Sequence, residues 1–213
     1  MNRKTLIIAA MLIPLVLFAF AVMSPDEPEF TVLEQNEAFE LREYKPYVVA
    51  EAIVEGGFDE ASDRAFRILV AYIQGNNLGG RNLPMTAPVK QQPIVSDGER
   101  ISMTAPMTQP ADANADSWLF QFVMPKEYIL PMLPKPVDER VALRPVPARL
   151  VAARRYRGGW REPKYRDNEL VLLDALQEAG LTPVSTPVFA RYNAPFVPGF
   201  LRRNEVLVDV ERQ

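Results

Sequence analysis

The residue types that are missing from this chain limit its chemistry more than those that are present. The 213 residues contain no histidine and no cysteine. A Ser-His-Asp triad, a Cys-His nucleophile pair, a Cys or His zinc site and a disulfide are therefore excluded. Carboxylates, lysines and tyrosines remain as groups that could carry chemistry, and the chain could equally bind a ligand without reacting with it.

Pairs of carboxylates are the strongest remaining indication of catalysis, and they are weak. Glu40 and Glu43 lie close together in a strand-like segment, but strands at a protein surface carry such pairs routinely. The sequence contains no Gly-rich phosphate loop and no cluster of metal ligands. We therefore expect no catalytic residue, no metal ligand and no enzymatic activity.

Composition and charge are those of an ordinary globular protein. Hydrophobic residues make up 48% and charged residues 24% of the chain, which is typical of folded domains and not of disordered segments. The net charge of −3 gives the protein no electrostatic attraction to nucleic acid. The 20 prolines favour short strands and turns over long helices.

The first 23 residues have the pattern of an export segment. Arg3 and Lys4 precede an uncharged, largely apolar run at residues 6–23. Its 18 residues are the lower limit for crossing a bilayer, and the positive start suits both a cleaved signal peptide and an uncleaved anchor. Residues 19–21 (Ala-Phe-Ala) offer a cleavage site, but the apolar run continues beyond them, so both interpretations remain open.

The leader determines the expected domain organisation and location. We expect residues 1–23 to be the signal peptide or membrane anchor, residues 24–29 to be a polar linker, and residues 30–213 to be the folded domain. An exported domain then lies in the periplasm, or on the periplasmic side of the inner membrane if the leader is kept. The membrane is a partner only in the second case.

The domain reads as two similar halves. In the first, strands at 30–34, 39–44 and 47–54 are followed by Gly56-Gly57 and a helix at 58–74. In the second, strands and a helix recur around Gly158-Gly159, at 141–144, 149–156, 167–179 (the helix), 187–192 and 205–210. The order predicts an α+β fold made of two βαββ halves, with two helices packed on an antiparallel sheet that is curved or closed into a distorted barrel.

A repeated motif lies between the halves. Met-Thr-Ala-Pro occurs at residues 85–88 and again at residues 103–106, with a Ser-Asp-Gly turn between the copies. The simplest geometry is a hairpin that carries one copy on each strand, with the prolines at strand ends or edges. The hydroxyls of Thr86 and Thr104 are then explained by hydrogen bonding at turns and strand ends.

Several short segments, taken together in this order, resemble the SOUL/haem-binding protein family. They are FELREY (39–44), FRILVAYIQGNN (66–77), both Met-Thr-Ala-Pro copies, FVMP (122–125), LPKP (133–136), ARYNAP (190–195) and FLRRNEV (200–206). The resemblance implies two pseudo-symmetric βαββ halves, related to bacterial effector-binding domains of the gyrase-inhibitor type. It also implies non-enzymatic binding of haem or another tetrapyrrole.

The resemblance places haem between the first helix and the loop before the last strand. The apolar arc of that helix covers roughly 200°, which is wider than the roughly 100° that a surface helix requires. The surplus flank and the loop aromatics suit a flat apolar ligand, and arginines suit its propionates. The expected haem-binding residues are Arg64, Phe66, Arg67, Val70, Ile73, Phe196, Phe200, Arg202 and Arg203. The alternative interpretation is that the flank packs beneath a loop and the arginines face solvent.

Iron coordination cannot follow the strongest pattern, because the chain has no His or Cys to act as an axial ligand. Tyr72 is a weak candidate ligand, and Tyr44 and Tyr192 are further phenols. The thioether candidates are Met85, Met103 and Met107. We therefore expect haem to be held non-covalently and exchangeably, by apolar packing and arginine contacts, for storage, transfer or buffering.

Two other functions remain open on the same fold. One is binding of a different apolar or cationic small molecule, for which a buried acid in the groove would be diagnostic; Glu51 and Glu55 are the candidates. The other is a membrane-anchored interaction module without a small ligand.

Overall fold

Each half of the domain folds into a strand, a helix and a further pair of strands, and the two halves join edge to edge in one sheet. The structure is a computed structural model that describes residues 26–94 and 117–212. Its elements are β1 (Phe30–Gln35), β2 (Glu40–Tyr44), β3 (Tyr47–Glu55), α2 (Phe58–Ile73), β4 (Val89–Pro93), β5 (Ser117–Val123), η1 (Leu130–Met132), β6 (Ala142–Val146), β7 (Arg149–Arg157), α3 (Glu162–Glu178), β8 (Leu181–Pro183), β9 (Val188–Arg191), η2 (Gly199–Leu201) and β10 (Arg203–Arg212).

The strand order reveals the duplication. The sheet runs β1-β2-β7-β10-β9-β4-β5-β3-β6, with β8 paired to β10 beside this path. The halves meet where β9 pairs with β4, and β2 and β6 each pair with the helix-bearing strand of the other half. This confirms the expected α+β fold of two βαββ halves on a curved antiparallel sheet.

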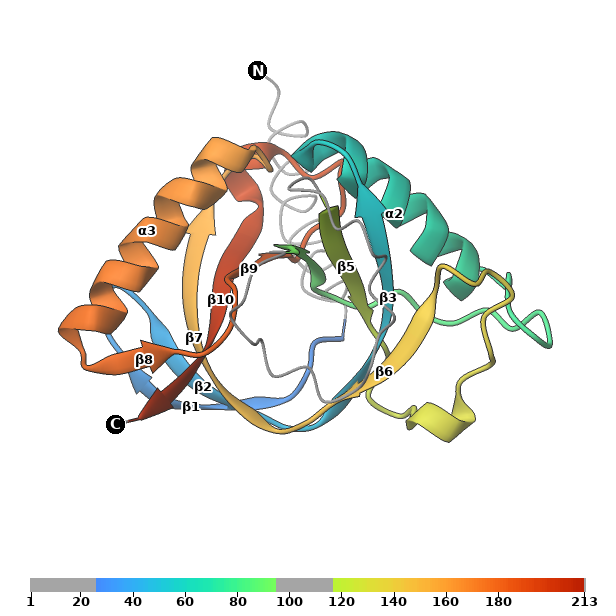
Figure 1. The fold of residues 1–213 in the computed structure, drawn as a ribbon, viewed down its shortest axis with the longest axis horizontal. Helices are drawn as coiled ribbons and strands as arrows, with labels where there is room; N and C mark the ends of the chain where they lie inside the picture. Colours follow the sequence, from blue (N-terminus) through green and yellow to red (C-terminus); the bar gives the residue numbers. More distant parts are fainter. Residues whose placement is uncertain (1–25, 95–116, 213) are drawn as a thin grey trace, which may run out of the picture.

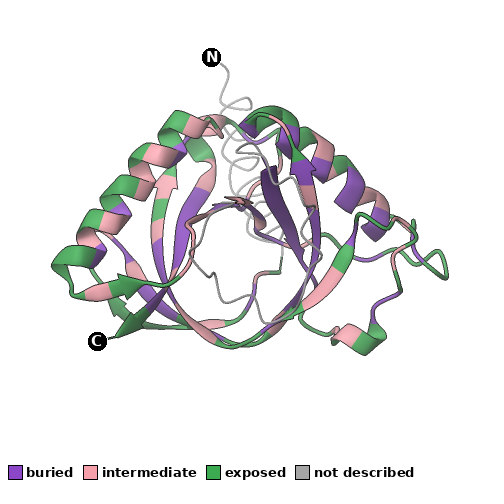
Figure 2. Cartoon of the chain, in the orientation of Figure 1, coloured by how far each residue is buried: buried purple, intermediate pink, exposed green. Residues whose placement is uncertain are grey.

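The sheet curls, and the two helices lie along its outer face (Figure 1). Alternation along each strand sends one set of side chains to the helices and the other set to the inner face of the curl. In β3 the helix-facing set is Val48, Ala50, Ala52 and Val54, which belong to the main core with Phe58 and Tyr72 of α2. In Figure 2 the central strands are largely buried, whereas the outer sides of both helices are exposed.

One detail differs from the sequence expectation. Helix α3 begins at Glu162 and not at residue 167, because Pro163 occupies its first turn, where a missing backbone N–H costs nothing. Its buried face consists of Tyr165, Leu172 and Leu176, whereas Leu170 is 62% exposed.

Two expectations concern residues outside the described part of the chain. The leader and the second Met-Thr-Ala-Pro copy lie there, so the export segment and the motif hairpin stay predictions. The first copy ends immediately before β4, whose two neighbours are β5 and β9. Within residues 26–94 and 117–212, no helix is long and apolar enough to cross a bilayer.

Residues 26–29, expected as a linker, pack on the domain. The backbone N–H of Ala87 donates to the carbonyl of Asp26 at 3.0 Å, and the backbone N–H of Lys45 donates to the carbonyl of Glu29 at 2.9 Å.

Candidate ligand-binding site

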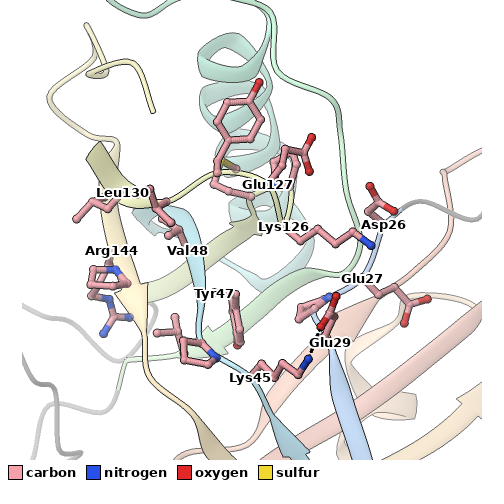
Figure 3. Close-up of a pocket in the computed structure, with 18 of the residues that line it drawn as sticks. Asp26, Glu27, Glu29, Lys45, Tyr47, Val48, Lys126, Glu127, Leu130 and Arg144 are labelled. Carbon is pink, nitrogen blue, oxygen red and sulfur yellow. Dashed lines mark hydrogen bonds and ion pairs between the residues drawn. The ribbon is translucent and has the colours of Figure 1, made fainter. Parts of the chain in front are cut away.

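A groove of about 880 Å³ opens where the β2–β3 turn, the segment after β5 and the end of β6 come together. Four stretches line it: residues 26–29, 45–48, 124–130 and 144–147 (Figure 3). This volume is within the range of about 300–1,000 Å³ that is usual for small-molecule sites. We call this feature the groove.

Prolines and strand pairing position the walls of the groove. The wall prolines are Pro28, Pro46, Pro125, Pro145 and Pro147. Their rings fix the backbone φ and present rigid apolar surface. Tyr47 at the start of β3 pairs with Val146 of β6, which brings two of the four stretches together. The groove therefore combines a stiff frame with mainly apolar walls, to which Val48, Met124 and Leu130 also contribute.

Three cations and four carboxylates line the groove; the carboxylates are those of Asp26, Glu27, Glu29 and Glu127. The Lys45 ammonium is 2.7 Å from a carboxylate oxygen of Glu29, and this pair is well exposed. Arg144 is paired with the buried Glu51 at 2.9 Å. Lys126 is exposed and makes no ion pair among the described residues. An anionic group bound here would find at least one uncommitted positive charge.

Tyr47 forms one wall of the groove and points its hydroxyl into a buried polar cluster. The Lys90 ammonium donates to Tyr47 Oη at 2.5 Å, and the Arg149 guanidinium donates to the same oxygen at 2.7 Å. Arg149 is also paired with Asp209 at 3.0 Å. Burial opposes ionisation of the phenol, but the charges of Lys90 and Arg149 outweigh it, so the pKa of Tyr47 lies below its usual 10.0.

Lys90 is a buried cation without a carboxylate partner. Its side chain is almost inaccessible, and its one hydrogen bond within residues 26–94 and 117–212 is to Tyr47. Burial lowers the pKa of Lys90 below its usual 10.5, because removing the ammonium from water disfavours the charged form. Lys90 and Tyr47 thus form a coupled acid–base pair directly behind the groove wall.

Glu51 lies on the same inner face as Lys90. It is 1% exposed, and one of its carboxylate oxygens accepts hydrogen bonds from Gln121 at 2.9 Å and from Arg144. The other oxygen, Oε1, has no partner in the described part of the chain. Glu55, the second acid considered from the sequence, is exposed. The structure therefore places a buried carboxylate at Glu51 and none at Glu55.

A second polar cluster lies farther along the inner face, around the fully buried Glu205. Its carboxylate receives two hydrogen bonds from Arg42, at 2.7 and 3.0 Å, and one from the hydroxyl of Tyr192 at 2.6 Å. Arg203 adds a further contact at 2.9 Å and stacks on the Tyr192 ring. Burial opposes ionisation, but the Arg42 contacts outweigh it, so the pKa of Glu205 lies below 4.5. These contacts join β2, β10 and the residue that follows β9.

The helix residues expected to bind haem line up along α2 but do not line the groove. Ile73 is buried, and Phe66 and Val70 are half-buried against the main core. Phe66 packs edge-on against Phe122, with 5.7 Å between the ring centroids. Arg64 donates to the carboxylate of Glu60, and Arg67 is exposed. The apolar flank of α2 is thus largely used in packing, while Arg67 is free to meet a ligand.

The loop residues expected to bind haem lie at one end of the sheet. Phe196 and Phe200 are 78% and 74% exposed. Arg202 donates to the carbonyls of Val197 and Pro195 and stacks over Trp160. Arg203 is committed to the Glu205 cluster and to Glu27. The nine expected residues therefore do not converge on one described cavity, and their role in haem binding stays a prediction.

The phenols that we considered as iron ligands are held away from ionisation. Burial raises the pKa of Tyr72 to about 12, and its hydroxyl donates to the Pro134 carbonyl at 3.0 Å. Burial also raises the pKa of Tyr44 to about 12 and that of Tyr192 well above 10.0. The tyrosine with the lowered pKa, Tyr47, escaped the sequence reasoning because nothing in the chain order connects it to Lys90 or Arg149.

The groove itself also escaped the sequence reasoning. Its four stretches are separated in the chain, and only Met124 and Pro125 belong to a motif that the sequence analysis singled out. The available signal was the clustering of prolines at strand ends, since five of the 20 prolines lie in its walls.

Solved structures share this fold at low sequence identity. The EcmrR C-terminal domain aligns with a TM-score of 0.59 and 11% identity, over 81% of this chain and 96% of that one. EcmrR in its DNA complex aligns with a TM-score of 0.58 and 12% identity, over 81% of this chain and 57% of that one. An uncharacterized conserved protein from Listeria innocua aligns with a TM-score of 0.51 and 10% identity, over 89% and 94% of the two chains. At these identities the likeness concerns the fold alone.

Sequence comparison supplies the family. No curated protein sequence matches this chain. The family model of the SOUL heme-binding protein matches residues 25–209, which includes the packed residues 26–29 and nearly all of the domain. The duplicated βαββ fold and this match agree: the chain belongs to the SOUL haem-binding protein family.

Proposed function

We propose that this protein binds haem or a related tetrapyrrole non-covalently in the groove. The observation that carries the proposal is a groove of about 880 Å³ with mainly apolar walls and with both cations and carboxylates in its lining, in a chain that belongs to a haem-binding family. Apolar walls suit a flat macrocycle, and lysine or arginine suits its propionates. The residues present therefore fit the group.

Different lining residues would contact the haem ring and its propionates. Pro46, Val48 and Leu130 would contact the ring faces, and Lys126 and Lys45 would meet the propionates. His and Cys, two common axial ligands of haem iron, are absent, so apolar packing and cation contacts would supply most of the binding. Binding is then weak enough for exchange, which suits a carrier, store or buffer and neither an enzyme nor an electron-transfer protein.

The proposed location is the bacterial envelope. The positive start and apolar run of residues 1–23 support export, to the periplasm or to the periplasmic side of the inner membrane. Neither the net charge of −3 nor the groove supports binding of nucleic acid.

Hemin titration followed by the Soret band tests the proposal. Lys126→Glu should weaken hemin binding several-fold, because it replaces the uncommitted cation at the groove with an anion. Two matched controls carry the same charge change: Lys135→Glu, an exposed lysine outside the groove, and Arg67→Glu, on the α2 flank. If Arg67→Glu weakens binding and Lys126→Glu does not, haem lies against the helix and the groove proposal is wrong.

A second candidate is binding of an apolar organic cation, favoured by the buried carboxylate of Glu51 with its unpartnered oxygen. Arg144 already pairs with Glu51, which makes this candidate the weaker one. A lipophilic phosphonium cation is the probe: saturable binding that Glu51→Gln abolishes would favour it. Saturable binding of neither ligand would favour a membrane-anchored interaction module.

A further inference from the structure

The loop between β9 and β10 exposes large apolar side chains at one end of the molecule. We call residues 193–202 the aromatic loop. Phe196 and Phe200 are 78% and 74% exposed, and Leu201 is 46% exposed. The loop lies beside the starts of helices α2 and α3 (Figure 1). A group of exposed apolar side chains indicates an interaction surface, whereas single exposed apolar residues are common on any protein.

The aromatic loop is rigidly supported. Arg202 lies over the Trp160 ring at 4.1 Å and donates to the Val197 carbonyl at 2.7 Å. A Cβ built on Gly199 would lie 3.6 Å from the backbone nitrogen of Gly159, so the loop rests directly on the segment before α3. The exposed side chains are therefore held outward by a packed base.

Basic residues surround this base. Arg157 is exposed and pairs through its backbone with Arg203 at the start of β10, while Arg161 and Lys164 are exposed at the start of α3. Acidic groups at this end begin both helices: Glu60 is paired with Arg64, Asp59 is exposed, and Glu162 is paired with Arg166. Aromatic side chains with a cationic rim match the headgroup region of a bilayer that contains anionic lipid.

The course of the chain brings the predicted leader to the same end. Asp26 is bound through its carbonyl to Ala87, at 3.0 Å, just before Val89 pairs with Arg191. Glu27 is paired at 2.7 Å with Arg203, the first residue after the aromatic loop, so the first described residues contact the base of the loop. The apolar run of the leader ends at Met23, and three residues span at most about 11 Å.

We propose that the aromatic loop docks on the bilayer surface, with Phe196 and Phe200 in the headgroup region of a membrane that contains anionic lipid. The inference rests on the envelope location proposed above and not on haem binding. A membrane-bound leader would place its end within a few residues of the loop, so docking of the loop would fix the orientation of the domain on the membrane.

The absence of native cysteine makes the test direct, because a single introduced thiol can be labelled. The full chain carrying Phe200→Cys, with an environment-sensitive fluorophore, is bound to vesicles of equal parts phosphatidylcholine and phosphatidylglycerol. The control is Leu78→Cys, an apolar position that is 61% exposed beyond the far end of α2. Doxyl-labelled lipid should quench the label at position 200 strongly and the label at position 78 weakly.

Three results would contradict the docking proposal. If an aqueous quencher reaches both labels equally, or if the chain does not associate with the vesicles, the docking proposal is wrong. Shielding of position 200 without vesicles would indicate a protein contact and would also overturn it. Hemin titration of the same samples reports haem binding separately, so failure of one proposal is distinguishable from failure of the other.

Discussion

At the residue scale, the inner face of the sheet is defined by charges that are almost fully buried. Arg42 and Glu205 are 1% and 0% exposed and are joined by two hydrogen bonds, whereas Lys90 has only a phenol as partner within the described ranges. Pairing with arginines offsets the cost of burying Glu205 and keeps it ionised. Lys90 has no carboxylate partner, so burial favours its neutral form and lowers its pKa.

Removal of the Glu205 charge should be costly. Glu205→Gln removes the buried counter-charge of Arg42 and leaves it only the part-exposed Glu40, at 2.7 Å, so we expect a loss of at most about 3–5 kcal/mol in the free energy of unfolding at neutral pH. Glu43→Gln, an exposed position on β2, should change it by less than about 0.5 kcal/mol. Urea denaturation measures both, and equal small effects would show that the cluster contributes no stability.

The pH dependence of this effect follows from the sign of the shift. The pKa of Glu205 is below 4.5 in the folded protein, so its stabilising effect is complete above that pH and is lost as the pH falls through the folded value. The difference between the native chain and Glu205→Gln should therefore shrink in acid. A difference that grows below pH 4.5 would contradict the lowered pKa.

Tyr47 should ionise before the other tyrosines. Its pKa is lowered by Lys90 and Arg149, while burial raises those of Tyr44 and Tyr72 to about 12. In a spectrophotometric titration, Tyr47→Phe should remove the earliest tyrosinate signal, and Lys90→Met should move that signal to higher pH. Tyr72→Phe is the control and should leave it unchanged. An early signal that survives Tyr47→Phe would assign it to another residue.

At the element scale, the two Gly-Gly pairs turn the chain from strand to helix in each half. The first glycine of each pair has a positive φ, of 119° at Gly56 and 141° at Gly158. Residues with a Cβ rarely adopt this conformation. The second glycine of each pair has no such requirement, since nothing lies within 4 Å of a Cβ built on Gly57 or Gly159.

This difference predicts an asymmetric result within one pair. Gly158→Ala should destabilise the fold by about 1–3 kcal/mol, because alanine would be strained at that φ. Gly159→Ala should change stability by no more than about 0.5 kcal/mol. Thermal denaturation compares the two, and equal effects would show that the strand exit tolerates a side chain at both positions.

Elements were more predictable than their contacts. Alternation and the Gly-Gly breaks predicted β3 and α2 to within one residue, because those patterns are local. Helix α3 begins five residues before the predicted residue 167, since proline is tolerated in a first turn and Pro163 lies there. The groove could not be predicted, because Tyr47, Lys126 and Arg144 meet only after β3, β5 and β6 have paired.

At the scale of the whole molecule, the curl of the sheet separates three surfaces with different uses. The outer face packs the helices, the inner face holds the buried ion pairs, and the groove lies where strands and proline-rich turns meet at the edge (Figures 1 and 3). The apolar flank of α2 is largely buried in the main core, because Phe66 and Val70 pack against that core. A haem-sized apolar surface is therefore offered by the groove more than by the helix.

The most direct test is paramagnetic broadening of backbone amide signals by ferric hemin bound to the full chain. Iron in the groove should broaden Tyr47, Leu130 and Val146 first and leave Phe66, Val70 and Phe200 sharp. The reverse pattern would place haem between the first helix and the aromatic loop and would contradict the groove as its site.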